Sequence, residues 1–150
     1  MKPLIVGEAP SKNEVTERPL EGRVGRRLAD LCGLTLEEFL QHFERINLLH
    51  VRQDTREKGF EFDAEAARFE AEQMRNTRML FAEGRVTLLL GKRVGAAFGC
   101  PTNYFERWWI MNAEAYVLPH PSGINRWWND HANEDKAARF MREIVRRTRA

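Results

Sequence analysis

Four short runs of apolar residues recur along the chain, and each is followed by glycine, proline or polar residues. Runs of this length, rich in Leu, Ile and Val and bounded by turn formers, are typical of buried β-strands. We therefore predict four strands, at residues 4–6, 45–51, 85–90 and 113–118. The polar stretch 54–62 is predicted to be a loop.

The segments between these runs have a helical period. Residues spaced by three and four positions predict helices at 22–32, from Thr35 onward, at 63–83, 92–98 and 134–147. Thr35 and Glu38 have the spacing of a capping box, and Gly33 and Gly84 are placed to end helices. The core-facing side chains of the two longest helices are predicted to be Ala66, Phe69, Met74 and Leu80, and Ala138, Met141, Ile144 and Val145.

Strands that alternate with helices favour one α/β domain, over residues 1–150, with a parallel sheet covered by helices on both faces. In such sheets ligands bind outside the carboxyl ends of the strands. Four segments are expected to meet at that edge: residues 7–10, 47–53, 91–92 and those from Pro119 onward.

Composition narrows the function classes without choosing one. The chain has 24 basic and 22 acidic residues, so any contact with a polyanion must depend on local clusters. The two cysteines, Cys32 and Cys100, form no CxxC pair, which argues against zinc fingers and four-cysteine clusters and favours a reducing, cytoplasmic setting. The apolar run near the N-terminus is too short for a signal peptide or a membrane span, so we expect no membrane association.

Two of the edge segments carry candidate chemistry. Glu8 and Glu14 follow the first strand, and the glycines Gly22 and Gly25 open the next helix, where free N–H groups suit an anion. These residues also fit an ordinary turn with solvated glutamates. His120 stands between two prolines, and the stiff backbone suits a preorganised hydrogen-bond donor, although a single histidine often has only a structural role.

In order along the chain, GEAP (7–10), RPLEGRVG (18–25), Asn47 and HPS (120–122) resemble the motifs of the uracil-DNA glycosylase superfamily. They look closest to the branch whose first motif reads GEAPG and whose last begins HPS. The resemblance implies a three-layer α/β/α sandwich around a central four-stranded parallel sheet. It also implies hydrolysis of the N-glycosidic bond of uracil or a modified pyrimidine that is flipped out of DNA.

The same resemblance implies roles for individual residues. Asn47 matches the residue that reads the base, because an amide offers a donor and an acceptor together. His120 matches the donor to pyrimidine O2, and either Glu8 or Glu14 would orient the water and favour the cationic sugar. The expected base pocket contains Gly7, Ala9, Leu20 and Asn47, and the expected DNA contacts are Arg23, Gly25, Ser122, Gly123, Asn125, Arg126 and Trp127. Ile124 or Arg126 could wedge into the gap left by the base.

The chain departs from the family pattern at several points. Ser11 stands where a glycine is usual, and Leu20 where an aromatic residue usually stacks on the base. Two cysteines cannot supply the four that bind an iron–sulfur cluster in this branch, so we expect no cluster, no other metal and no cofactor. The stretch GINRWWND (123–130) does not belong to the family motif, and its tryptophans could stack on an unpaired base or fold back toward the last helix.

Other positions leave alternatives open. Arg139, Arg142 and Arg146 form either a solvated helix face or a phosphate-binding face, and Trp108–Trp109 fit a core or a partner surface. The function predicted from the sequence is a DNA glycosylase that acts as a monomer. Leu20 and Ser11 also fit a binding module without hydrolysis, and the tryptophan segment fits a transferase that modifies a base in the same pocket.

Overall fold

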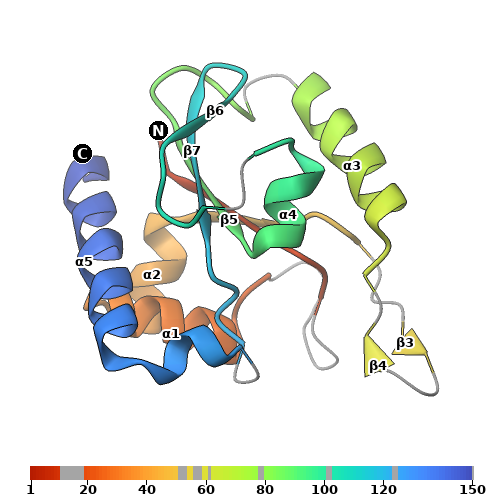
Figure 1. Ribbon diagram of the computed structural model, residues 1–150. Coiled ribbons are helices and arrows are strands. Elements are labelled where there is room, and N and C mark those ends of the chain that lie inside the picture. Colours follow the sequence, from red (N-terminus) through yellow and green to blue (C-terminus); the bar gives the residue numbers. More distant parts are fainter. Residues whose placement is uncertain are drawn as a thin grey trace.

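The computed structural model describes residues 1–10, 19–50, 54–55, 59–60, 62–77, 80–100, 103–122 and 125–149. A five-stranded sheet lies at its centre, in the order β2-β1-β5-β7-β6 (Figure 1). Four strands are parallel: β1 (Leu4–Gly7), β2 (Glu44–Asn47), β5 (Val86–Leu90) and β7 (Ala113–Leu118). They confirm the predicted parallel sheet. The fifth strand, β6 (Trp108–Ile110), pairs antiparallel with β7 and was not predicted.

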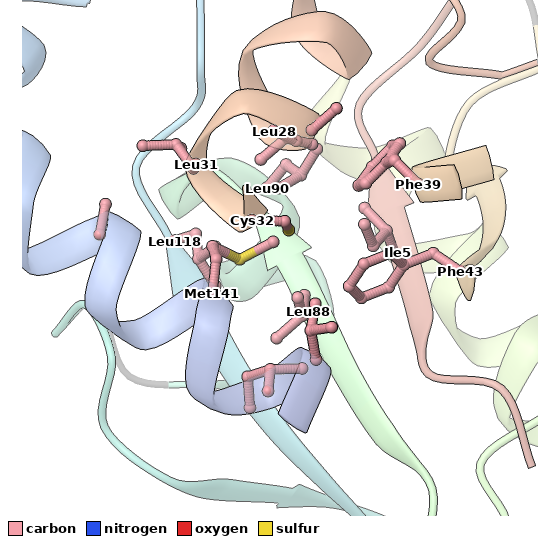
Figure 2. Packing of buried hydrophobic residues seen from close by; sticks show 14 of the residues in the cluster. Ile5, Leu28, Leu31, Cys32, Phe39, Phe43, Leu88, Leu90, Leu118 and Met141 are labelled. Carbon is pink, nitrogen blue, oxygen red and sulfur yellow. The ribbon is translucent and has the colours of Figure 1, made fainter. Parts of the chain in front are cut away.

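Alternation along the strands sends side chains to two separate cores. Ile5, Leu88 and Leu118 contribute to one core, together with α1 (Arg23–Cys32), α2 (Leu36–His42) and α5 (His131–Thr148). Figure 2 shows this core, where Cys32 and Met141 meet the strand residues. Leu4 and Val6, which alternate with Ile5, contribute to the other core with α3 (Ala64–Asn76) and α4 (Lys92–Ala97). Helices thus cover both faces of the sheet, as a three-layer sandwich requires (Figure 1).

Local signals explain most helix ends. Thr35 accepts from the Glu38 backbone N–H while Glu38 accepts from the Thr35 N–H, so the predicted capping box is present. Gly33 adopts a left-handed conformation after α1, with φ 71°, as predicted. The last helix begins at His131, before the predicted start at Glu134, because Asp130 caps its N-terminus through the Ala132 N–H.

The prediction of one helix over residues 63–83 was wrong in its length and its orientation. Helix α3 ends at Asn76, and Phe81 beyond it packs edge-on against Phe98 of the segment after α4, with the ring centroids 5.5 Å apart. Phe69 was predicted to face the core but is 62% exposed. The buried positions are Ala67, Ala71 and Met74, and Phe69 lies two residues from both alanines, which places it on the opposite side of the helix.

Two other strand assignments also need correction. Strand β2 ends at Asn47 rather than at residue 51, although the Leu48 and Leu49 N–H groups continue to donate to Gly7 and Glu8. The segment predicted as a loop contains a short antiparallel pair, β3 (Asp54–Thr55) with β4 (Gly59–Phe60). A 3₁₀ helix, η1 (Arg126–Asn129), precedes α5 and contains two of the four tryptophans.

Candidate active site

The carboxyl ends of the parallel strands bring four predicted segments to one edge of the sheet. Hydrogen bonds join the segments: the Leu48 N–H donates to the Gly7 carbonyl at 2.8 Å, and the Gly91 N–H donates to the Leu118 carbonyl at 2.7 Å. Gly7 also pairs in register with Asn47. The main chain therefore places Glu8, Asn47 and His120 around the same edge.

Glycines at this edge allow side chains to approach the backbone closely. A Cβ atom on Gly7 would lie 2.7 Å from Asn47 Oδ1, which is too close for any other residue type without a shift. A Cβ atom on Gly91 would lie 3.3 Å from Glu8 Oε1 and 3.4 Å from His120 Cβ, and Gly91 has φ +99°. Gly91 is therefore required both for its backbone conformation and for the space that Glu8 and His120 occupy.

Glu8 and His120 form the polar centre of the site. The Glu8 side chain is 8% exposed, and its Oε1 lies 3.9 Å from His120 Nε2, beyond hydrogen-bonding distance. Burial lowers the pKa of His120, the negative charge of Glu8 opposes this effect, and the positive charge of Arg93 adds to it. Burial is the largest of these influences, so the site favours the neutral imidazole.

Arg93 is a charged residue of the site that sequence reasoning missed. Its Nη2 donates to Glu8 Oε2 at 2.7 Å. The residue lies in the first turn of α4, two positions after Gly91. Its place after a strand end was visible in the sequence, but nothing in the sequence showed that its side chain would turn toward Glu8.

Leu20 forms an apolar wall beside the base-reading candidate. It is 6% exposed, and its Cδ2 lies 3.4 Å from the position of a Cβ on Gly7, next to Asn47. Leu20 has a positive φ of 64°, and its carbonyl oxygen lies 1.6 Å from where a Cβ on Gly25 would be. Gly25 thus accommodates the Leu20 backbone, whereas its contact with DNA stays a prediction.

The segment after His120 folds back and holds the His120 backbone. Trp128 Nε1 and Asn125 Nδ2 donate to the His120 carbonyl at 2.9 and 3.1 Å. Trp128 is 5% exposed, and the Arg27 guanidinium lies 4.5 Å from its ring centroid. Trp128 shares a core with Ala137 and Met141 of α5, so of the two alternatives for the tryptophans this one folds back toward the last helix.

Trp127 is half-buried in a group of aromatic side chains. Its ring centroid lies 5.9 Å from that of Tyr104, 5.8 Å from that of Phe105 and 4.8 Å from that of Trp128. Its carbonyl accepts a hydrogen bond from Asn133 Nδ2 at 3.0 Å. Contact of Trp127 with DNA stays a prediction, as does that of Asn125, whose amide is bonded to the His120 carbonyl and the Trp127 N–H.

The structure describes some of the other predicted site residues and leaves the rest outside its described ranges. Arg23 and Arg126 are exposed, while Ala9 and Ser122 are half-buried. Ser11, Glu14, Gly123 and Ile124 lie outside the described residues.

A family model matches residues 1–147, nearly the whole chain. The chain belongs to the uracil DNA glycosylase superfamily. No individual curated protein matches it. Membership indicates DNA glycosylase activity in general terms, with DNA as the polymer acted upon, and it agrees with the α/β fold described above.

Three further observations concern a membrane-spanning helix, metal-binding groups and the two cysteines. The described helices include none long and apolar enough to cross a membrane. Within the described ranges, no three His, Cys, Asp or Glu side chains group closely enough to hold a metal ion. Cys32 and Cys100 are buried in the two different cores, and burial raises their pKa values to about 12 and about 11. The two thiols therefore cannot bind one metal ion together.

Proposed function

We propose that this superfamily member is a monofunctional DNA glycosylase that hydrolyses the N-glycosidic bond of uracil or a modified pyrimidine flipped out of DNA. The observation that supports the proposal is the meeting of Glu8, Asn47 and His120 at one sheet edge, with Gly7 and Gly91 making room for them. These side chains suit three separate tasks, namely reading a base, stabilising a leaving anion and stabilising a cationic sugar.

Base reading falls to Asn47 and Leu20. The Asn47 side chain is 7% exposed, and an amide carries the donor and the acceptor that match the pairing edge of a pyrimidine. Leu20 is an apolar wall next to it. An aliphatic wall lacks the stacking surface of an aromatic ring, so we expect either weaker binding of uracil or a site shaped for a different base.

Bond cleavage needs charge stabilisation at both ends. As the bond from the sugar C1′ to the base nitrogen breaks, its electron pair moves onto the pyrimidine, and a neutral His120 donates a hydrogen bond to O2. The Glu8 carboxylate favours the positive charge that develops on the sugar. Water then adds to C1′ and gives up a proton to the solvent, and the departing base anion takes up a proton from the solvent, which leaves a neutral free base and an abasic site. Either Glu8 or Glu14 would orient that water.

The test is release of free base from duplex oligonucleotides that contain uracil, hydroxymethyluracil or mismatched pyrimidines. His120→Ala is expected to lower the rate about 100- to 1000-fold, the usual loss when a donor to a developing anion is removed. His131→Ala, which changes an exposed histidine at the start of α5, is the matched control and is expected to leave the rate unchanged.

Different failures of this test point to different functions. Selective binding of a modified base that is lost in Asn47→Ala, without base release by the parent protein, would indicate a binding module. A gain in mass on a base, measured by mass spectrometry of the treated oligonucleotide, would indicate a transferase. An unchanged rate in His120→Ala would remove His120 from the mechanism.

A further inference from the structure

Glu8 is a nearly buried carboxylate whose negative charge is compensated by one identified cation. The Glu8 side chain is 8% exposed, whereas that of Arg93 is 53% exposed, so the pair reaches from the interior of the site to its surface. A buried carboxylate without a compensating charge is strongly destabilising. The 2.7 Å bond to Arg93 Nη2 meets this requirement at Oε2 and leaves Oε1 on the side of His120.

Residues around the Arg93–Glu8 pair fix the position of both side chains. The guanidinium carbon lies 4.9 Å from the centroid of the Phe62 ring, within the range of a cation–π contact. On the other side of Glu8, the missing side chain of Gly91 leaves the space that Glu8 Oε1 occupies. The carboxylate therefore has one oxygen bound to Arg93 and the other placed between Gly91 and His120.

Two charged side chains act on the His120 ring in the described structure, and they act in opposite directions. Glu8, which follows β1, favours the protonated imidazole, and Arg93, on α4, disfavours it. If Arg93 were removed, its guanidinium would no longer compensate the negative charge of Glu8. The carboxylate of Glu8 would then be able to rotate beside His120.

We propose that Arg93 is a positioning residue that acts through Glu8: it fixes the carboxylate against His120 and prevents Glu8 from turning the imidazole into an imidazolium. Its catalytic consequence rests on the glycosylase function proposed above. The chemical reason is that a neutral imidazole already has one N–H group with which to donate a hydrogen bond to an anion. In an imidazolium beside Glu8, the added proton would be held by the carboxylate.

The direct test is an NMR titration of the His120 ring in the full chain, with the signal assigned by its loss in His120→Gln. Arg93→Gln is expected to raise the pKa of His120, and Arg93→Lys to restore most of the parent value, because the charge returns. Glu8→Gln is expected to lower it, and in the Glu8→Gln, Arg93→Gln double variant the upward shift is expected to vanish. Lys92→Gln removes a charge one position away and is the matched control.

The activity assay follows the same logic. Arg93→Gln is expected to lower kcat roughly 10-fold at neutral pH, less than loss of a direct donor, with little change in KM. The acidic limb of its pH profile is expected to move to higher pH, so that part of the rate returns as the solution becomes more alkaline.

Two results would overturn the inference: an unchanged His120 pKa in Arg93→Gln, or an equal shift in Lys92→Gln, which would show a general effect of net charge. The titration separates this inference from the proposed function. If the parent protein releases no base from any oligonucleotide, the glycosylase proposal fails, while the titration still decides whether Arg93 controls His120 through Glu8.

Discussion

The chain contains two adjacent pairs of tryptophans, and the structure treats them in opposite ways. Trp108 and Trp109 lie in the edge strand β6 and are 44% and 55% exposed, whereas Trp128 of the second pair is 5% exposed. Neighbouring residues in a strand point to opposite faces, so the two rings lie on opposite sides of the sheet edge, and both are exposed there. In the 3₁₀ helix η1 the rings of Trp127 and Trp128 meet edge-on; the Trp128 indole N–H donates to the His120 carbonyl, and the Trp127 carbonyl accepts from Asn133 of α5.

The comparison shows that the backbone around a tryptophan, rather than its hydrophobicity, decides whether its ring is buried or exposed. The first pair lies in β6, at the edge of the sheet beside β7. The second pair has hydrogen-bond partners in His120 and Asn133. Each pair has an arginine over one ring, at 4.5 Å for Arg27 over the buried Trp128 and at 5.8 Å for Arg107 over the exposed Trp109. Four substitutions, ordered from the largest expected effect to the smallest, test this contrast.

Trp128→Ala is expected to have the largest effect. It removes a buried ring and a donor to the His120 carbonyl, and the free energy of unfolding should fall by about 3–5 kcal/mol. Urea unfolding followed by circular dichroism measures the loss. A loss below about 1 kcal/mol, the range expected for an exposed residue, would contradict the contrast.

Asn125→Ala should have the next largest effect. It removes the second donor to the His120 carbonyl and the acceptor of the Trp127 N–H, with an expected loss of about 1–2 kcal/mol. The base-release rate should fall as well, because the His120 backbone loses a support. Asn129→Ala, an exposed amide in the same 3₁₀ helix, is the control; equal losses in the two variants would show that Asn125 has no special part.

Arg27→Gln tests the cation over the Trp128 ring. The contact at 4.5 Å should contribute roughly 0.5–1 kcal/mol of stability, as cation–π contacts do near a surface. The exposed neighbour Arg26 provides the comparison through Arg26→Gln, whose unfolding midpoint should stay close to that of the parent. If both variants lose the same stability, only net charge matters.

Trp109→Ser should have the smallest effect on stability, less than about 0.5 kcal/mol, because more than half of the ring is already in contact with solvent. Thermal unfolding of this variant beside Trp128→Ala gives the contrast in one experiment. A loss that approaches that of Trp128→Ala would mean that β6 depends on the ring and that the two pairs are equivalent.

Most of the sheet could be predicted from the sequence because three of its four parallel strands, β1, β5 and β7, are nearly continuous apolar runs buried on both faces. Strand β6 is also a short apolar run, Trp108–Ile110, but its tryptophans were interpreted as a core or a partner surface rather than as a strand, and its pairing with β7 is seen only in the structure. Phe69 was misplaced because it is the largest apolar side chain of α3, but the small residues Ala67 and Ala71 are the ones buried in the core.

The candidate site was predictable where it depends on strand ends and on short motifs, as for Glu8, Asn47 and His120. It was not predictable where it depends on side-chain direction. Arg93 is one arginine among many in the sequence, and only the three-dimensional structure shows its bond to Glu8. The bond of Trp128 to the His120 carbonyl likewise follows from the path of the chain through η1.

The place of β1 in the sheet has a consequence for the order of folding. This strand pairs with β2, about 40 residues away, and with β5, about 80 residues away. Because contacts between distant segments form slowly, the unit from β1 to β2 can form early, while the docking of β5 must wait. Gly91 follows β5, so the space for Glu8 and His120 opens only at that late step. Partly folded chains should therefore contain native helices before they contain the candidate site.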